Sequence, residues 1–395
     1  MNLEDTPQQA AFRAEVREFI ATMVPAQLKG LRQGIVQGPG LKEAQVQPFY
    51  DALRSKGWRA PHWPREFGGA GFDEAHMVIL TEEFTRAALP GMKDVGLDML
   101  GMILIAYGTK AQQERFLGPT LRGELTWAQG YSEPQAGSDL ANLALRCDVT
   151  DDGFLLNGQK IWTSKAHIAD WLFLLVRTDS TMKKKQDGIS FLLLDMKTPG
   201  ITVRPIHTID DHHHFNETFF DNVKVPRANL VGELHKGWKL AKSLLSHERF
   251  SHPTSDPLVI GRALDNLKGS ARALAAGEGM VWDDPVLRRR VTQLDMDVDC
   301  LRYTRYRALT KVMHGDEPGP ETMMFKMFGA ELMQRIVELH AEVMGPLGTI
   351  WERSPFPEEN GETAKHGANI RAATIRGGTS EVQRNIIAKN VLNLP

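Results

Sequence analysis

The stretch Trp127–Leu140 reads W-A-Q-G-Y-S-E-P-Q-A-G-S-D-L, and the fold is decided here. It begins as a short strand and ends in a polar turn. Pro134 fixes φ and removes a backbone donor, while Gly137 allows backbone conformations that other residues avoid. We therefore expect backbone N–H groups and the hydroxyls of Ser132 and Ser138 to face one point. A ligand rich in carbonyl or phosphate oxygens would bind there; an ordinary turn between strands is the alternative.

A second glycine-rich stretch, R-G-G-T-S-E-V-Q at 376–383, lies near the C-terminus. Together the two stretches resemble the two signatures of the acyl-CoA dehydrogenase family of flavoproteins, with Gln135 where the family usually has glycine. Between them, K-I-W-T-S at 160–164 resembles the tryptophan segment that lies against the flavin. Within the family, the sequence is similar to the large subunit of pimeloyl-CoA dehydrogenase and related bacterial enzymes.

The composition is that of an ordinary soluble globular protein. The 395 residues include 47 Lys and Arg and 49 Asp and Glu, so the net charge is −2. No strong field for nucleic acid or a membrane surface follows. Cys147 and Cys300 are the two cysteines, and their spacing suits neither a disulfide framework nor a metal site. The polar, acidic N-terminus and the lack of a bilayer-length apolar run predict a cytoplasmic protein without membrane insertion.

The first 123 residues carry helical signals. Thr6 with Gln9, and Thr109 with Gln112, have the spacing of capping boxes at helix starts. The segment Trp58–Gly71 holds several Pro and Gly residues and predicts a turn with its tryptophans packed beneath it. We expect an N-terminal helical domain over residues 1–123.

From residue 124 the pattern changes to short β-prone runs divided by Gly, Asp and Pro. The runs are Leu145–Val149, Gly153–Leu156, Trp171–Arg177, Ile189–Leu194, Val203–Ile206 and Thr218–Val225. They predict an antiparallel β-sandwich or barrel over residues 124–236. Lys183–Lys185 predicts a solvated loop tip, with contact to CoA phosphates as the alternative. His212–His214 are expected at the surface or the substrate edge, because adjacent histidines point different ways and complete no metal site.

Helical signals return over residues 237–395, with long stretches at Leu258–Ala276, Pro285–Met313 and Glu321–Val343. The resemblance implies an α+β fold of the acyl-CoA dehydrogenase type. Its parts are an N-terminal helical domain, a middle β-domain and a C-terminal four-helix bundle.

The resemblance also implies an activity, the FAD-dependent oxidation of an acyl-CoA thioester to the trans-2-enoyl-CoA. A base removes the α-proton and a hydride passes to flavin N5. Many family members place the base directly before the Gly-Thr of the C-terminal signature, where this chain has Gly377. Others place it in a Glu-Arg pair on the first helix of the C-terminal domain, which Glu248 and Arg249 match. Glu248 is thus the expected base, Arg249 an orienting residue, and the Gly377 N–H a donor to the thioester; a simple ion pair at a helix end is the alternative for Glu248.

Several further residues align with family contacts to FAD, although packing or loop bonding is the alternative for each. Those aligned with the flavin ring are Gln129, Tyr131, Ser132, Trp162 and Ser164. Ser138 aligns with a position near both the thioester and the cofactor. Thr379 and Glu381 align with contacts to the FAD diphosphate region.

Two segments depart from the family pattern. Gly277–Asp284 lacks the expected arginine, and Glu342–Gly348 has Glu and Pro where the family has other residues. Both changes touch the family's contact to a neighbouring subunit's FAD. They weaken the contact expected in an ordinary homotetramer and favour a non-identical partner that completes the site, so a homotetramer and a heterotetramer with a related chain both stay open. The resemblance implies an electron-transfer flavoprotein as the electron acceptor. An acyl-CoA oxidase and a non-catalytic subunit are the alternative functions.

Overall fold

The computed structural model describes residues 5–24, 43–87, 89, 94–251, 256–313, 322–351 and 362–394. They form two compact units that interleave along the chain. One unit contains Met1–Phe49, Phe72–Gly91 and Arg249–Pro395; the other contains Tyr50–Gly71 and Met92–Glu248. Each unit has a hydrophobic core of its own.

The unit of residues 50–71 and 92–248 is built on an eight-stranded sheet with the order β6-β7-β3-β2-β4-β5-β8, in which β1 also pairs with β4. The strands are β1 (Trp127–Gly130), β2 (Arg146–Val149), β3 (Gly153–Lys160), β4 (Trp171–Arg177), β5 (Ile189–Asp195), β6 (Ile201–His207), β7 (His213–Pro226) and β8 (Leu230–Val231). Most pairs are antiparallel, but β1 and β2 each run parallel to β4. The alternating pattern did not predict these two pairings, because alternation reports which face is buried and not the direction of a strand.

Strands β4 and β5 are buried on both faces. Side chains at alternate positions of the two strands enter two different cores. Leu172, Leu174 and Val176 face β2, β3 and β7, which gives the sandwich-like layer that the sequence predicts. Trp171 and Phe173 face the opposite way, toward the helices of this unit.

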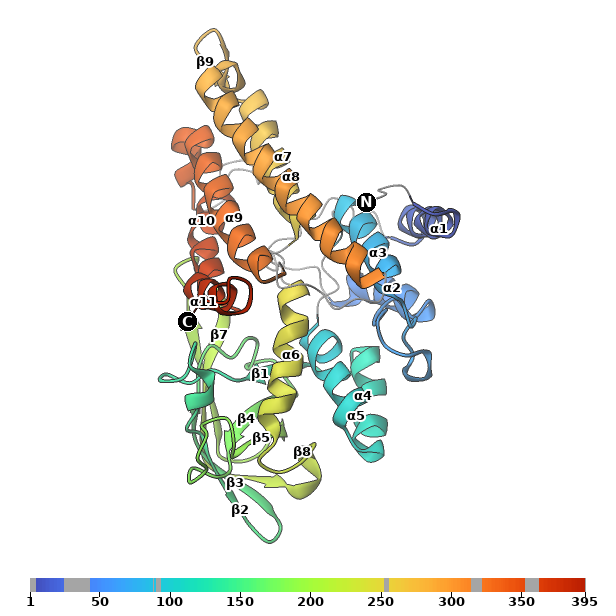
Figure 1. Ribbon diagram of the computed structural model, residues 1–395, viewed down its shortest axis with the longest axis vertical. Helices are drawn as coiled ribbons and strands as arrows, with labels where there is room; N and C mark the ends of the chain where they lie inside the picture. The colour runs from blue at the N-terminus through green and yellow to red at the C-terminus, as the bar shows by residue number, and fades with distance from the viewer. Residues whose placement is uncertain are drawn as a thin grey trace. The chain divides into compact units, whose positions relative to one another are not determined.

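The helices of this unit cover that second face. They are α4 (Met102–Tyr107), α5 (Lys110–Arg122) and α6 (Gly237–Ser251), with a π-helical stretch at Gly96–Gly101 before α4; Figure 1 shows α4, α5 and α6 on one side of the sheet. The capping box at Thr109 is present, and Phe116 points into the core as expected. Trp63, in the turn-rich segment, is fully buried and donates its ring N–H to the Leu97 carbonyl at 3.0 Å. The prediction of a turn with packed tryptophans is confirmed.

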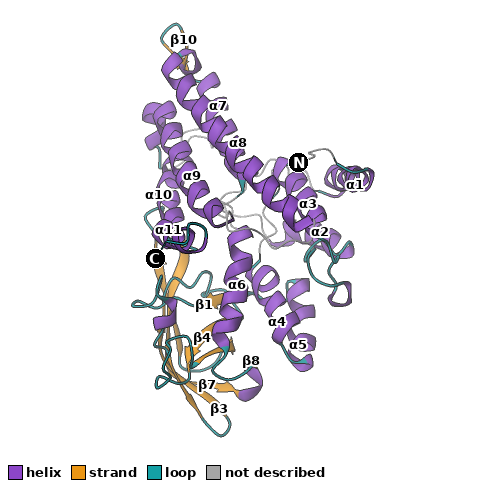
Figure 2. Ribbon diagram, viewed as in Figure 1, coloured by secondary structure: helices purple, strands orange, loops and turns teal. Residues whose placement is uncertain are grey.

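The other unit is helical. It holds α1 (Pro7–Met23), the first part of α2 (Glu43–Ser55), α3 (Glu74–Arg86), α7 (Pro257–Ala273), α8 (Pro285–Met313), α9 (Thr322–Met344), α10 (Glu362–Ile370) and α11 (Ser380–Asn390), with a small hairpin of β9 (Ala275–Ala276) and β10 (Gly279–Met280). The long helices α7, α8 and α9 pack against one another around an aliphatic core (Figure 2). Glu83 on α3 bonds Arg13 and Arg17 of α1, which fixes the first helix to this unit.

The chain thus has helices, then a sheet, then helices, as predicted. The N-terminal helices are nevertheless divided between the two units, with α1 and α3 beside the C-terminal bundle and α4 and α5 beside the sheet. Sequence periodicity does not reveal this division, since it identifies apolar faces but not the surface that each face meets. The domain limits 1–123, 124–236 and 237–395 stay a prediction.

Candidate active site

The first signature folds as a short strand followed by a closed turn. After β1, Glu133 and Ala136 exchange both backbone hydrogen bonds, at 3.1 and 3.0 Å, and enclose Pro134 and Gln135. The Ala136 side chain is buried while Ser138 is exposed. The backbone closes the turn, and Gln135 and Ser138 are exposed.

A buried ion pair supports this turn from below. Lys160, fully buried, lies 2.7 Å from the Glu133 carboxylate and donates to the Tyr131 carbonyl at 3.1 Å. The same carboxylate accepts the N–H groups of Ala144 and Leu145 at 2.6 and 3.0 Å. Burial lowers the pKa of Lys160 to about 8, although the Glu133 charge acts in the opposite direction. The pair thus joins β3 to the middle of the signature and to the backbone at Ala144 and Leu145, which follow it.

The tryptophan segment follows β3 directly. Trp162 has φ +58°, a left-handed conformation that a bulky side chain rarely adopts. Its ring is 53% exposed and meets the Phe215 ring edge-on at 5.9 Å. The Ile161 N–H donates to the Ser132 carbonyl at 2.9 Å, so the two predicted flavin segments are joined.

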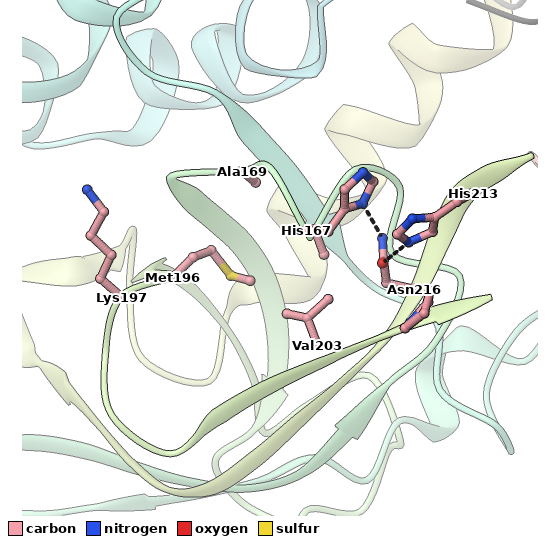
Figure 3. Close-up of a pocket in the computed structure, with 9 residues that line it drawn as sticks. His167, Ala169, Met196, Lys197, Val203, His213 and Asn216 are labelled. Carbon is pink, nitrogen blue, oxygen red and sulfur yellow. Dashed lines mark hydrogen bonds between the residues drawn. The ribbon is translucent and has the colours of Figure 1, made fainter. Parts of the chain in front are cut away.

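A hollow of about 360 Å³ lies beside this segment, as Figure 3 shows. It is lined by Ala166, His167, Ala169, Met196, Lys197, Val203, Pro205, His213 and Asn216. Asn216 bonds both histidines, whose rings stack at 4.0 Å. Burial and the neighbouring His213 lower the pKa of His167. Among the described residues, no group of three or more His, Cys, Asp or Glu side chains could hold a metal ion.

The C-terminal signature forms the start of α11. Gly377 and Gly378 have φ +64° and +91°, which explains the two glycines. A Cβ on Gly378 would lie 2.6 Å from the Gln383 side chain. Thr379 caps the helix by accepting the Val382 N–H at 3.1 Å, and the buried Lys326 donates to the Gly378 carbonyl. The helix N-terminus suits an anion by its dipole and its exposed N–H groups.

The predicted site residues occur in three places. Gln129, Tyr131, Ser132, Ser138, Trp162 and Ser164 lie together on β1, its turn and the loop after β3; Gly377, Thr379 and Glu381 lie at the start of α11; Glu248 and Arg249 lie in the last turns of α6. The division between the two units falls between Glu248 and Arg249, whose side chains lie outside the described part of the chain. Tyr131 is buried and meets Phe173 edge-on at 6.1 Å, so it also has a packing role.

These surroundings fit FAD in chemistry. The exposed Trp162 ring offers stacking area, and the adjacent Thr163 hydroxyl is buried without a hydrogen-bond partner among the described residues. Beside the second signature, the Ser380 hydroxyl and the Gln383 carbonyl oxygen are likewise buried and unpaired within the described chain. Unsatisfied polar atoms next to positive-φ backbone are typical of a site that a ligand completes.

Models of three domains of one protein family match this chain one after another. The acyl-CoA dehydrogenase N-terminal, middle and C-terminal domains match residues 6–124, 128–223 and 235–392. The acyl-CoA dehydrogenase IpdE1 of Mycobacterium tuberculosis is 37% identical to this chain over an alignment of 393 residues. The alignment covers 97% of this chain and 97% of that protein.

The chain belongs to the acyl-CoA dehydrogenase family.

It is accordingly an FAD-dependent oxidoreductase, as the two signatures predict. The acyl-CoA dehydrogenase FadE26 of M. tuberculosis is 31% identical over 400 residues, 100% of this chain and 99% of that protein. Two solved structures share the fold over 100% of both chains. One is the Tcur3481-Tcur3483 steroid ACAD, with a TM-score of 0.84 and 28% identity; the other is the ChsE4-ChsE5 complex from M. tuberculosis, with 0.82 and 30%.

Two features of this acyl-CoA dehydrogenase were not predicted from its sequence. Lys160 was expected in the flavin segment, but its buried ion pair with Glu133 was not. A lysine on the buried face of an alternating strand was the available signal for this pair. The role of the Asn216 side chain was not predicted either, because Thr163 and His167, which it bonds, come from a distant loop.

Proposed function

We propose that this chain oxidises the α,β-bond of an acyl-CoA thioester, with Glu248 as the proton-abstracting base. The match of the whole chain to the family carries the proposal. Bound FAD supplies the acceptor for the hydride that leaves the β-carbon. The residues of the chain then have to hold the thioester, remove the α-proton and stabilise the charge that develops on the thioester oxygen.

Two features support Glu248. Gly377 has no side chain to act as base at the other family position, and its positive φ suits glycine. Glu248 lies near the C-terminal end of α6, at the position of the family's Glu-Arg pair, and its carboxylate can act as a general base. Arg249 is proposed to orient the site, and Ser138 and the Gly377 N–H to contact the thioester.

The proposed FAD contacts follow the predicted segments. Gln129, Tyr131, Ser132, Trp162 and Ser164 would hold the flavin ring, with Ser138 near both cofactor and thioester; Thr379 and Glu381 would contact the diphosphate region. The Glu381 backbone N–H and the Thr379 hydroxyl hold the pKa of Glu381 below its ordinary value. Since a charged carboxylate repels a diphosphate, we propose that this segment contacts the diphosphate through backbone N–H groups at the start of α11 and not through the Glu381 carboxylate.

Replacement of Glu248 by Gln tests the base. The variant keeps the size of the side chain but loses its basic oxygen, so we expect turnover to fall by about 10²–10⁴-fold. Its FAD content and acyl-CoA binding should stay near those of the parent protein. Glu114→Gln, at an exposed position of α5, is the matched control. Near-normal turnover by folded, flavin-loaded Glu248→Gln would refute the assignment.

The acyl group is proposed to be bulky and ring-bearing, because the Tcur3481-Tcur3483 steroid ACAD shares the fold over the whole chain at 28% identity. Steroid-bearing, dicarboxylic and straight-chain acyl-CoA esters, compared by kcat/KM with an artificial electron acceptor, test this. Preference for the straight-chain ester would contradict it.

The natural electron acceptor is proposed to be an electron-transfer flavoprotein. Slow reoxidation of the reduced enzyme by oxygen would support this acceptor, whereas rapid reoxidation would indicate an acyl-CoA oxidase.

We further propose assembly with a second, related chain. The departures from the family pattern are locally satisfied: Glu342 bonds Arg290 at 2.5 and 2.9 Å, and Asp283 accepts the Met280 N–H at 2.8 Å. Neither altered segment, Gly277–Asp284 or Glu342–Gly348, has an arginine to offer a neighbouring FAD. The ChsE4-ChsE5 structure is a complex of two named chains, which supports the same assembly here.

The free thiols of Cys147 and Cys300 are consistent with the cytoplasmic location that we propose.

The described residues include no helix that combines the length and apolar character needed to cross a bilayer.

A further inference from the structure

The loop that carries Trp162 is held in an unusual conformation. Trp162 and Lys165 both have φ +58°, so two left-handed residues enclose Thr163 and Ser164. Such a backbone persists only where its surroundings determine it. Among the described residues, the loop backbone bonds to the Ser132 carbonyl through Ile161 and to β7 through Thr163 and Lys165.

Asn216 on β7 supplies most of that support. Its carbonyl accepts the Thr163 N–H at 3.0 Å, and its side-chain nitrogen donates to the Thr163 carbonyl, also at 3.0 Å. One buried residue therefore holds both backbone groups of Thr163. The Lys165 N–H donates to the neighbouring His214 carbonyl at 2.8 Å.

The orientation of the Asn216 amide follows from these bonds. Because the Thr163 carbonyl can only accept, the amide nitrogen must face it. The amide oxygen then accepts from His213 Nε2 at 2.8 Å, and the nitrogen also reaches His167 Nδ1 at 3.2 Å. Figure 3 shows both histidines bonded to the Asn216 amide.

The loop borders an open hollow. Ala166 and His167 line this hollow of about 360 Å³ together with Asn216. The Trp162 ring meets Phe215 edge-on, and Trp162 is 53% exposed. The described hydrogen bonds to β7 therefore fix the backbone that carries the ring.

We propose that Asn216 is a positioning residue that holds the Trp162–Ser164 loop in the conformation needed to bind the flavin. The inference rests on the proposed flavin contact of Trp162. Its essential interaction is the bond from the Asn216 side chain to the Thr163 carbonyl, and the contacts with His167 and His213 are secondary.

Three variants of the full-length protein test this, each prepared both without FAD and loaded with it. Asn216→Asp keeps the shape but turns the donor toward Thr163 into an acceptor. His213→Phe keeps the stacked ring but removes the bond to the amide oxygen. Ser190→Ala removes a buried hydroxyl that accepts the His235 N–H at 2.9 Å in the same unit, and serves as the control for general loss of stability.

The measurements are hydrogen exchange of the 161–165 amides in FAD-free protein, the dissociation constant of FAD, and the visible absorption spectrum of bound flavin. For Asn216→Asp we expect faster exchange at Thr163, an FAD dissociation constant raised about tenfold and a shifted flavin spectrum, because a buried carbonyl loses its donor. His213→Phe and Ser190→Ala should differ from the parent by less than about threefold in FAD affinity.

Parent-like exchange and FAD affinity in Asn216→Asp would overturn the proposal, as would equal losses in Ser190→Ala. Equal losses in His213→Phe would overturn the primary role of the Thr163 bond. A parent protein that binds no FAD would instead refute the proposed function, so the two failures are distinguishable.

Discussion

Replacement of Lys160 by Met should destabilise the unit that contains the sheet. The ammonium is fully buried and lies 2.7 Å from the Glu133 carboxylate. Its loss leaves the buried Glu133 carboxylate with two hydrogen-bond partners among the described residues, the N–H groups of Ala144 and Leu145. Removal of one partner from a buried ion pair costs about 3–5 kcal/mol. At about 2–4 °C per kcal/mol for a unit of this size, the melting temperature should fall by about 6–20 °C.

The pH dependence gives an independent check on the same pair. Burial lowers the pKa of Lys160 from 10.5 to about 8 in the folded protein. Between these values the unfolded state binds more protons than the folded state, so this lysine makes stability rise with pH. Below pH 8 the cost of burying the ammonium is fully present. Lys160→Met should lack the rise between pH 8 and 10.5.

Calorimetric unfolding of the flavin-loaded protein from pH 6 to 10.5 measures both effects. Lys224→Met, at an exposed position of β7, is the control and should change the free energy of unfolding by less than about 0.5 kcal/mol. Combining Lys160→Met with Glu133→Gln removes the unpaired charge and should recover part of the loss. A Lys160→Met protein as stable as Lys224→Met, with an unchanged pH profile, would refute the reasoning.

Three further predictions concern packing, thiols and assembly. Gly101→Ala places a Cβ 2.0 Å from the Trp63 ring and should lower the melting temperature strongly. At Gly269 an added Cβ has no atom within 4 Å, so Gly269→Ala should stabilise α7 by about 0.5–1 kcal/mol. Thermal unfolding of both variants compares the two effects. Burial raises the pKa of Cys147 to about 12, so a thiol reagent should label native protein once per chain, at the exposed Cys300; rapid double labelling would contradict this. Native mass spectrometry should find a tetramer of two different chains when a related subunit is co-expressed, and an active, flavin-saturated homotetramer would exclude the need for it.

Much of the site was predictable because its chemistry is local in sequence. The capping residue Thr379 and the two glycines before it predict the start of α11 from a few adjacent positions. The turn after β1 follows in the same way from Pro134 and its neighbours. Such turns depend on the backbone preferences of the residues within them, so a single stretch of sequence contains the necessary information.

The sequence by itself determined the order of helices and strands, both glycine-rich signatures and the family. Only the tertiary structure showed that Lys160 neutralises Glu133, that Asn216 holds Thr163, and that α1 and α3 belong to a different unit from α4 and α5. The reason is the range of the interactions. Periodicity and turn chemistry act over a few residues, whereas these contacts join residues 27 and 53 positions apart, whose pairing depends on how the strands are arranged.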